Sequence, residues 1–268
     1  VLLDASDGFG GLATSCIEYL RDEYGKSILA FPLLESALSE PSAADIIRSI
    51  NIVMCFNRLG EYASLFSPLS CEQDGCPRAG PARTFNHLIY NQNSKYHTSA
   101  LLATALDTMS IRYRHKENTM ASLSDLCADL KLSRRSVAAM SLSLPFPMTA
   151  GEDLIDVLDT HEGPIWTSLT PQVDISGDET LQSIGLRGIP EERLKRPMQQ
   201  AGKQMEKNAY RCSSVHEMMT MYFACNYHVS PTYLTNISAG LKLSPAFPRF
   251  FKDYVNGEGN IGGSKSGE

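Results

Sequence analysis

The sequence contains no long apolar run and no excess of positive charge. No segment of the 268 residues approaches the roughly 20 consecutive apolar residues that a membrane-spanning helix requires, so we expect no transmembrane segment. Lys and Arg number 24 against 30 Asp and Glu, which gives a formal net charge of −6. Nucleic-acid-binding proteins normally present a basic face, so this balance argues against a nucleic-acid partner.

The cysteines do not form the patterns of a disulfide or zinc scaffold. There are seven, an odd number, and they are scattered, which favours reduced thiols in a cytosolic setting. Cys71 and Cys76 flank a short segment, but zinc sites usually need four ligands and no second close pair occurs. We therefore expect loop and core cysteines and no metal centre.

The remaining composition is that of an ordinary globular protein. Apolar residues make up 43% of the chain and charged residues 20%. The length permits a full hydrophobic core in one large domain or two small ones. The chain opens on Val1 inside a strand pattern, so we expect it to be a piece of a longer protein.

The first 31 residues predict a βαβ unit. A short apolar run precedes a glycine-rich loop at residues 4–11, and residues 12–24 then have apolar side chains at helical spacing. Gly25 stands where a left-handed helix cap is favoured, and residues 27–31 are apolar again. Such a unit implies a parallel sheet with helices on its faces. The apolar set of the helix is Leu12, Cys16, Ile17, Leu20 and Tyr24.

The glycine loop is the first candidate site, because parallel sheets bind ligands at the carboxyl ends of their strands. Backbone N–H groups at a helix N-terminus can hold a phosphate, and glycines allow close approach. No Lys follows the glycines, so the loop is not a P-loop. Asp7 would repel a phosphate unless a metal ion or water lay between them, and a simple tight turn is the alternative interpretation. The candidate nucleotide-binding residues are Ser6, Asp7, Gly8, Gly10 and Gly11.

Further helices and strands follow in alternation. Residues 42–59 predict a helix with Ser42 and Asp45 as a weak capping box. Its apolar stripe consists of Ala43, Ile46, Ile47, Ile50, Val53 and Met54. Helices are also predicted at 98–109, 124–132 and 215–227, and strands at 140–144, 182–187 and 233–243. Residues 111–114 fit either a strand or a helix tail, and residues 256–268 predict a disordered tail.

Other potentially chemical residues have a simpler structural explanation. Asp125 and Asp129 lie four apart on one predicted helix face, where they could hold a metal or polarise water, or simply face solvent. His97 and His216 have no nucleophile at motif spacing, which favours structural roles. The basic residues between 193 and 207 are diluted by glutamates and predict a solvated helix or loop.

Several segments resemble tubulins. The glycine loop and the helix ending LRDEYGKSILAFP resemble the tubulin GGGTGSG loop and its following helix. The segment HTSALLATALDTMS resembles the long central tubulin segment, LSLPFP the strand that ends in VPFP, and GLRG the FRG of a later strand. The sequence resembles the Misato family, a divergent branch of the tubulin and FtsZ superfamily, more closely still. The segments that carry this resemblance are LLDASDGFGG, HTSALLATALDT, LPFP, PIWTSLTP and QSIGLRG. The resemblance covers most of the chain from Val1 to about Phe251.

The resemblance implies an α/β, tubulin/FtsZ-like fold with a partial parallel sheet flanked by helices and a degenerate second α+β domain. We expect the nucleotide-binding part with its central helix at 1–120, the second domain at 121–255 and the tail at 256–268. The family implies a non-enzymatic regulator of mitochondrial distribution, morphology and fusion, in the cytoplasm and at the mitochondrial outer membrane. The resemblance also implies protein partners at the mitochondrial surface and peripheral association with the membrane. The alternative is a GTP-binding or GTP-hydrolysing filament protein.

Departures from the tubulin pattern bear on that choice. The loop SDGFGG has lost glycines and the threonine of GGGTGSG. Tubulins carry an Asn-Ala-Asp or Asn-Ala-Glu segment that hydrolyses GTP on the neighbouring subunit, and here Cys127 replaces the Asn before Ala128 and Asp129. The first nucleotide loops of tubulins would precede Val1. We therefore expect no cofactor and no catalytic residue in this chain, while binding of GTP by the full-length protein is an open alternative. We also expect an open sheet edge with exposed apolar surface.

Overall fold

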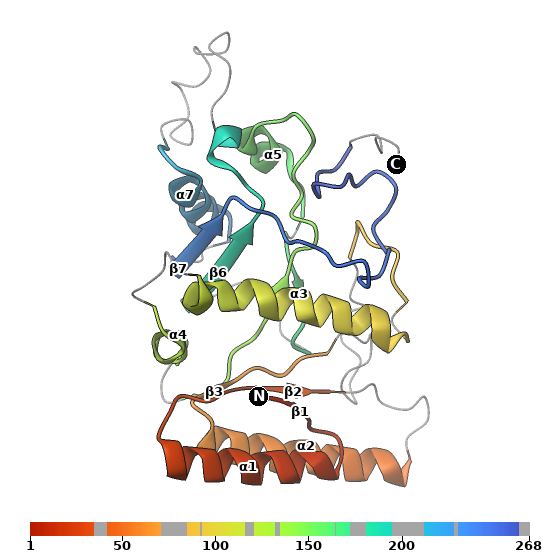
Figure 1. The fold of residues 1–268 in the computed structure, drawn as a ribbon, viewed down its shortest axis with the longest axis vertical. Helices are drawn as coiled ribbons and strands as arrows, with labels where there is room; N and C mark the ends of the chain where they lie inside the picture. The colour runs from red at the N-terminus through yellow and green to blue at the C-terminus, as the bar shows by residue number, and fades with distance from the viewer. Residues whose placement is uncertain are drawn as a thin grey trace.

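The computed structural model describes residues 1–34, 42–70, 85–91, 93–115, 121–131, 135–163, 165–171, 181–194, 212–227 and 230–262. The elements lie in layers (Figure 1). Two helices form one end, a small parallel sheet covers them, a long helix crosses the other side of that sheet, and a second unit of strands and helices lies beyond it.

The first layer and its sheet confirm the predicted βαβ unit. Strands β1 (Leu2–Asp4), β2 (Leu29–Leu33) and β3 (Leu65–Phe66) form a parallel sheet in the order β1-β2-β3. Helices α1 (Gly8–Tyr24) and α2 (Ala43–Tyr62) connect them on one face of the sheet (Figure 1). β1 lies at an edge with Leu2 59% exposed, as expected for an open apolar edge.

The helix ends follow the local signals in the sequence. Gly25 caps α1 with φ of 57°, and its N–H donates to the Arg21 carbonyl. Ser42 and Asp45 form a full capping box at the start of α2. α1 begins at Gly8 rather than at Leu12, because the glycines form its first turn instead of a loop.

The middle layer is built on α3 (Lys95–Arg114) and α4 (Leu123–Asp129). α3 continues through residues 111–114, which settles that segment as a helix tail. The core beneath it combines β2, α3 and α4 with residues around 142 and 250. This core takes residues from both sides of the expected domain boundary at 120, so that boundary stays a prediction.

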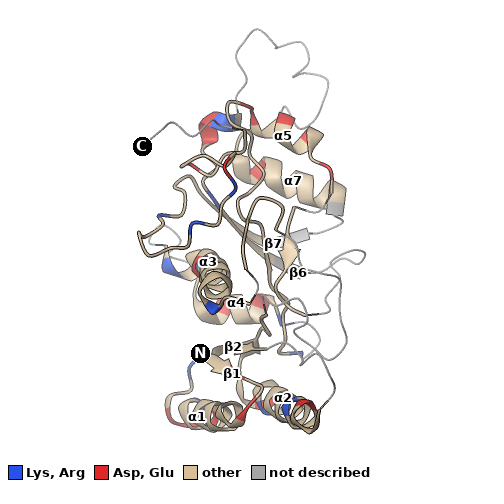
Figure 2. Cartoon of the chain, turned by 90° about the vertical axis from the view of Figure 1, so that its right-hand side faces the viewer, with Lys and Arg blue, Asp and Glu red and all other residues tan. Residues whose placement is uncertain are grey.

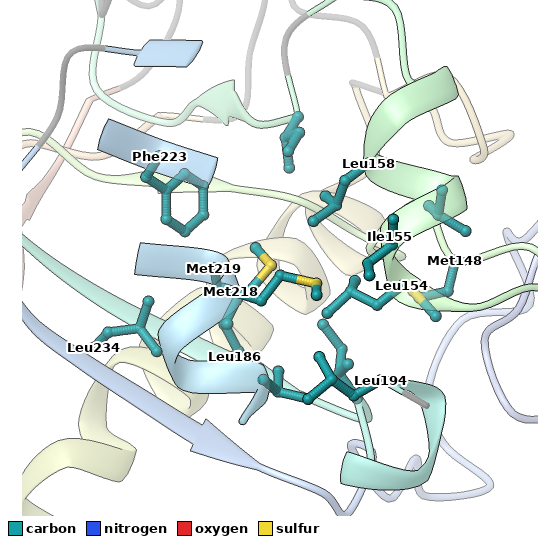
Figure 3. Packing of buried hydrophobic residues seen from close by; sticks show 14 residues of the cluster. Met148, Leu154, Ile155, Leu158, Leu186, Leu194, Met218, Met219, Phe223 and Leu234 are labelled. Atoms are coloured by element: carbon teal, nitrogen blue, oxygen red, sulfur yellow. The ribbon is translucent and has the colours of Figure 1, made fainter. Parts of the chain in front are cut away.

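The second unit has its own core (Figure 3). β4 (Ser141–Leu142) and β5 (Thr167–Ser168) pair antiparallel, and β6 (Leu181–Arg187) and β7 (Ser230–Ile237) pair parallel. Helices α5 (Leu154–Thr160) and α7 (Val215–Tyr227) and the 3-10 turn η1 (Glu191–Leu194) complete it. The core centres on Met218, Met219 and Phe223 of α7, with the Trp166 ring 5.0 Å from that of Phe223.

One prediction about this half needs revision. The expected disorder of the tail is wrong for residues 256–262, because the Ile261 N–H donates to the Met148 carbonyl and its carbonyl accepts from Ala150. These bonds tie a glycine-rich turn to the second unit, and residues 263–268 lie outside the described part. The predicted solvated helix or loop begins with η1, where Glu191 and Glu192 are exposed, Arg193 is half-buried and Leu194 is buried, and residues 195–208 lie outside the described part.

The apolar stripes of the first two helices do not face the sheet. On α2, Cys55 and Leu59 are the buried residues, and on α1 only Ile17 of the predicted set is buried. Apart from Ile17, the buried positions of both helices are ones that apolar spacing alone did not identify. The outward side chains on α2 are each more than half exposed: Ile46 64%, Ile47 59%, Ile50 52%, Val53 67% and Met54 63%.

Candidate functional site

The glycine turn lies where β1 ends and α1 begins. Asp7 is the N-cap of α1, and its Oδ1 accepts the Phe9 N–H at 2.8 Å. The Gly10 N–H donates to the Asp7 carbonyl at 3.2 Å, and the Ser6 N–H donates to Asp4 Oδ1 at 2.8 Å. A carboxylate is the anion that a helix N-terminus favours. The turn therefore supplies its own anion where a phosphate would bind.

The glycines of the turn differ in role. A Cβ at Gly10 would lie 3.0 Å from the Asp4 carbonyl oxygen and 3.4 Å from Ala5 Cα, so the close packing of α1 on β1 requires a glycine. A Cβ at Gly8 or Gly11 would meet nothing within 4 Å. Only Gly10 is explained by packing within the turn.

The predicted site residues lie together but face different surroundings. Ser6 is 5% exposed, and its hydroxyl makes no hydrogen bond within the described part of the chain. The Asn51 amide of α2 donates to the Ser6 carbonyl at 3.1 Å, which anchors the turn. Asp7, Gly8 and Phe9 are exposed, and Phe9 is 67% exposed. The turn is held from inside and open to solvent outside.

Asp125 and Asp129 do not form a shared carboxylate site. Asp125 is the N3 residue of the capping box of α4, whose N-cap is Ser122. Its Oδ2 accepts the Ser122 N–H and hydroxyl, each at 2.7 Å, and these hydrogen bonds, the hydroxyl one first, lower the Asp125 pKa. The Asp129 carboxylate instead pairs with the Arg112 guanidinium of α3. Within the described residues, no group of three or more His, Cys, Asp or Glu side chains could hold a metal ion.

The segment that resembles the tubulin hydrolytic loop is partly buried, with Cys127 inside the fold and Ala128 exposed. Cys127 is 4% exposed, and burial raises the pKa of its thiol. Arg112 is 3% exposed, and its guanidinium also lies 4.0 Å from the centre of the Tyr233 ring. Asp129 therefore serves as the counter-charge of a buried cation.

The two histidines have structural contacts. His97 Nδ1 accepts the Asn91 N–H at 3.0 Å, and its ring packs edge-on at 5.6 Å against Phe250. His216 is the second residue of α7, and its carbonyl accepts the Thr220 hydroxyl at 2.8 Å. Cys71 and Cys76 lie outside the described residues.

Asp107 is a residue that sequence reasoning missed. Its carboxylate pairs with Arg114 on the same helix and with Arg187 on β6, and so joins α3 to the second unit. Gly185 lies beside this contact, since a Cβ there would be 3.0 Å from the Thr108 carbonyl. The i, i+7 spacing of Asp107 and Arg114 was visible in the sequence, but the partner on β6 was not.

A cavity of about 1950 Å³ lies between α3, β6 and the segments at residues 137–148 and 238–260. Its walls are mainly apolar, and it exceeds the roughly 300–1,000 Å³ of typical small-molecule sites. Neither this cavity nor a smaller one of about 400 Å³ beside His161 is lined by the glycine turn. No described helix is long and apolar enough to cross a membrane.

The parallel sheet, the glycine turn and the long central helix define a tubulin-like protein, and a family model described as a tubulin domain matches residues 1–115. Protein misato of Drosophila melanogaster is 37% identical over 255 residues, covering 92% of this chain and 44% of that protein. Protein misato homolog 1 of Danio rerio is 32% identical over 268 residues, covering 97% and 44%. Its Mus musculus counterpart is 32% identical over 263 residues, covering 95% and 46%.

The chain belongs to the Misato family of tubulin-like proteins. It spans less than half the length of these relatives. The expected fold class is confirmed.

Proposed function

We propose that the chain is part of a non-enzymatic protein that regulates mitochondrial distribution, morphology and fusion. It acts through protein partners in the cytoplasm and at the mitochondrial outer membrane, where it associates peripherally. The family resemblance supports the mitochondrial role. The mode of action is supported by the geometry of the glycine turn.

The Asp7 carboxylate carries the non-enzymatic part of this proposal. It binds the Phe9 N–H at the helix N-terminus, where the phosphates of a nucleotide would need free donors. A phosphate at this position would have to displace a bound carboxylate and overcome its charge. The pairing of Asp129 with Arg112 supports the same conclusion for the hydrolytic segment.

The alternative function is a GTP-binding or GTP-hydrolysing filament protein. One observation favours it: the buried Ser6 hydroxyl lacks a partner within the described residues, at the end of β1 where such sheets bind ligands. A bound phosphate could supply the missing acceptor.

Rescue of mitochondrial morphology in cells depleted of the full-length protein separates these functions. The informative variant is Gly11→Glu, which places a second carboxylate at the turn where a side chain meets nothing within 4 Å. Gly11→Ala is the matched control. We expect both variants to restore a normal network as well as wild type. Failure of Gly11→Glu alone, at equal protein level, would favour the nucleotide hypothesis, and failure of wild type to affect mitochondria would overturn the proposed role.

A further inference from the structure

We draw no further inference here: the strongest candidate, the exposed apolar side chains on the outer face of α1 and α2 (Figure 2), carries nothing, because the chain spans less than half the length of its relatives and nothing in the described part of the structure shows what covers this face in the full-length protein.

Discussion

Gly10 offers a quantitative test of how α1 is joined to the sheet. Gly10→Ala places a Cβ 3.0 Å from the Asp4 carbonyl oxygen and 3.4 Å from Ala5 Cα. Both neighbours are backbone atoms at the end of β1, so they cannot move away by changing a rotamer. Crowding of this kind costs about 1–3 kcal/mol. The helix propensity of alanine returns about 1 kcal/mol, which leaves the variant less stable by roughly 0–2 kcal/mol.

Gly11→Ala is the matched control. Its Cβ would meet nothing within 4 Å, so the variant should gain about 0.5–1 kcal/mol from helix propensity alone. The difference between the two variants isolates the crowding term of about 1–3 kcal/mol. With a shift of roughly 2–4 °C per kcal/mol, the melting temperatures should differ by about 2–12 °C. Thermal unfolding by circular dichroism measures both. If Gly10→Ala is as stable as Gly11→Ala, α1 does not pack on β1 as described.

Three further results are expected. Asp129→Ala should destabilise the protein by about 2 kcal/mol in urea unfolding, since it leaves the buried Arg112 cation without its carboxylate partner, whereas Asp125→Ala should destabilise it less, because it removes only the exposed N3 half of a capping box. Folding lowers the Asp125 pKa from its ordinary value of 3.8. The ionised carboxylate therefore contributes to folding stability above pH 3.8, and this contribution is lost as the pH falls through the lower pKa of the folded state. Asp125→Asn should reduce this acid sensitivity in a pH series of melting curves. Burial raises the Cys55 pKa to about 11, so iodoacetamide should modify exposed Cys16 well before Cys55 in peptide mapping.

Local signals in the sequence predicted the local structure well. Gly25 as a left-handed cap and the Ser42–Asp45 capping box are both present. These features depend on residues within one turn of each other, so the sequence contains all the information needed. The parallel βαβ unit followed from element order and connection length, which restrict topology strongly.

The orientation of helices was predicted less well. Apolar spacing identified the stripe of Ile46, Ile50 and Val53 but not which side of α2 rests on the sheet. That choice depends on the shape of the sheet and on residues distant in the chain. In the same way, the Asp125 and Asp129 carboxylates share a helix face by spacing, yet their partners on the loop and on α3 separate their roles.

The candidate site was located from sequence, but its internal geometry was not. Glycines after a strand predicted a turn at the start of a helix. They could not reveal that Asp7 binds the Phe9 N–H, because Asx side chains compete with ligands for such donors in a way that depends on backbone angles. The crowding at Gly10 was equally invisible, since it arises from the approach of α1 to the end of β1.

The proposed function requires that the full-length protein acts without a nucleotide-dependent assembly step. Sedimentation of the full-length protein with magnesium and either GTP or GDP tests it most directly. The self-capped turn predicts the same sedimentation profile with GTP, with GDP and without nucleotide, and no retained nucleotide after desalting. The contrary result would be polymer that pellets with GTP but not with GDP. In that case Gly11→Glu should abolish the polymer and Gly11→Ala should preserve it.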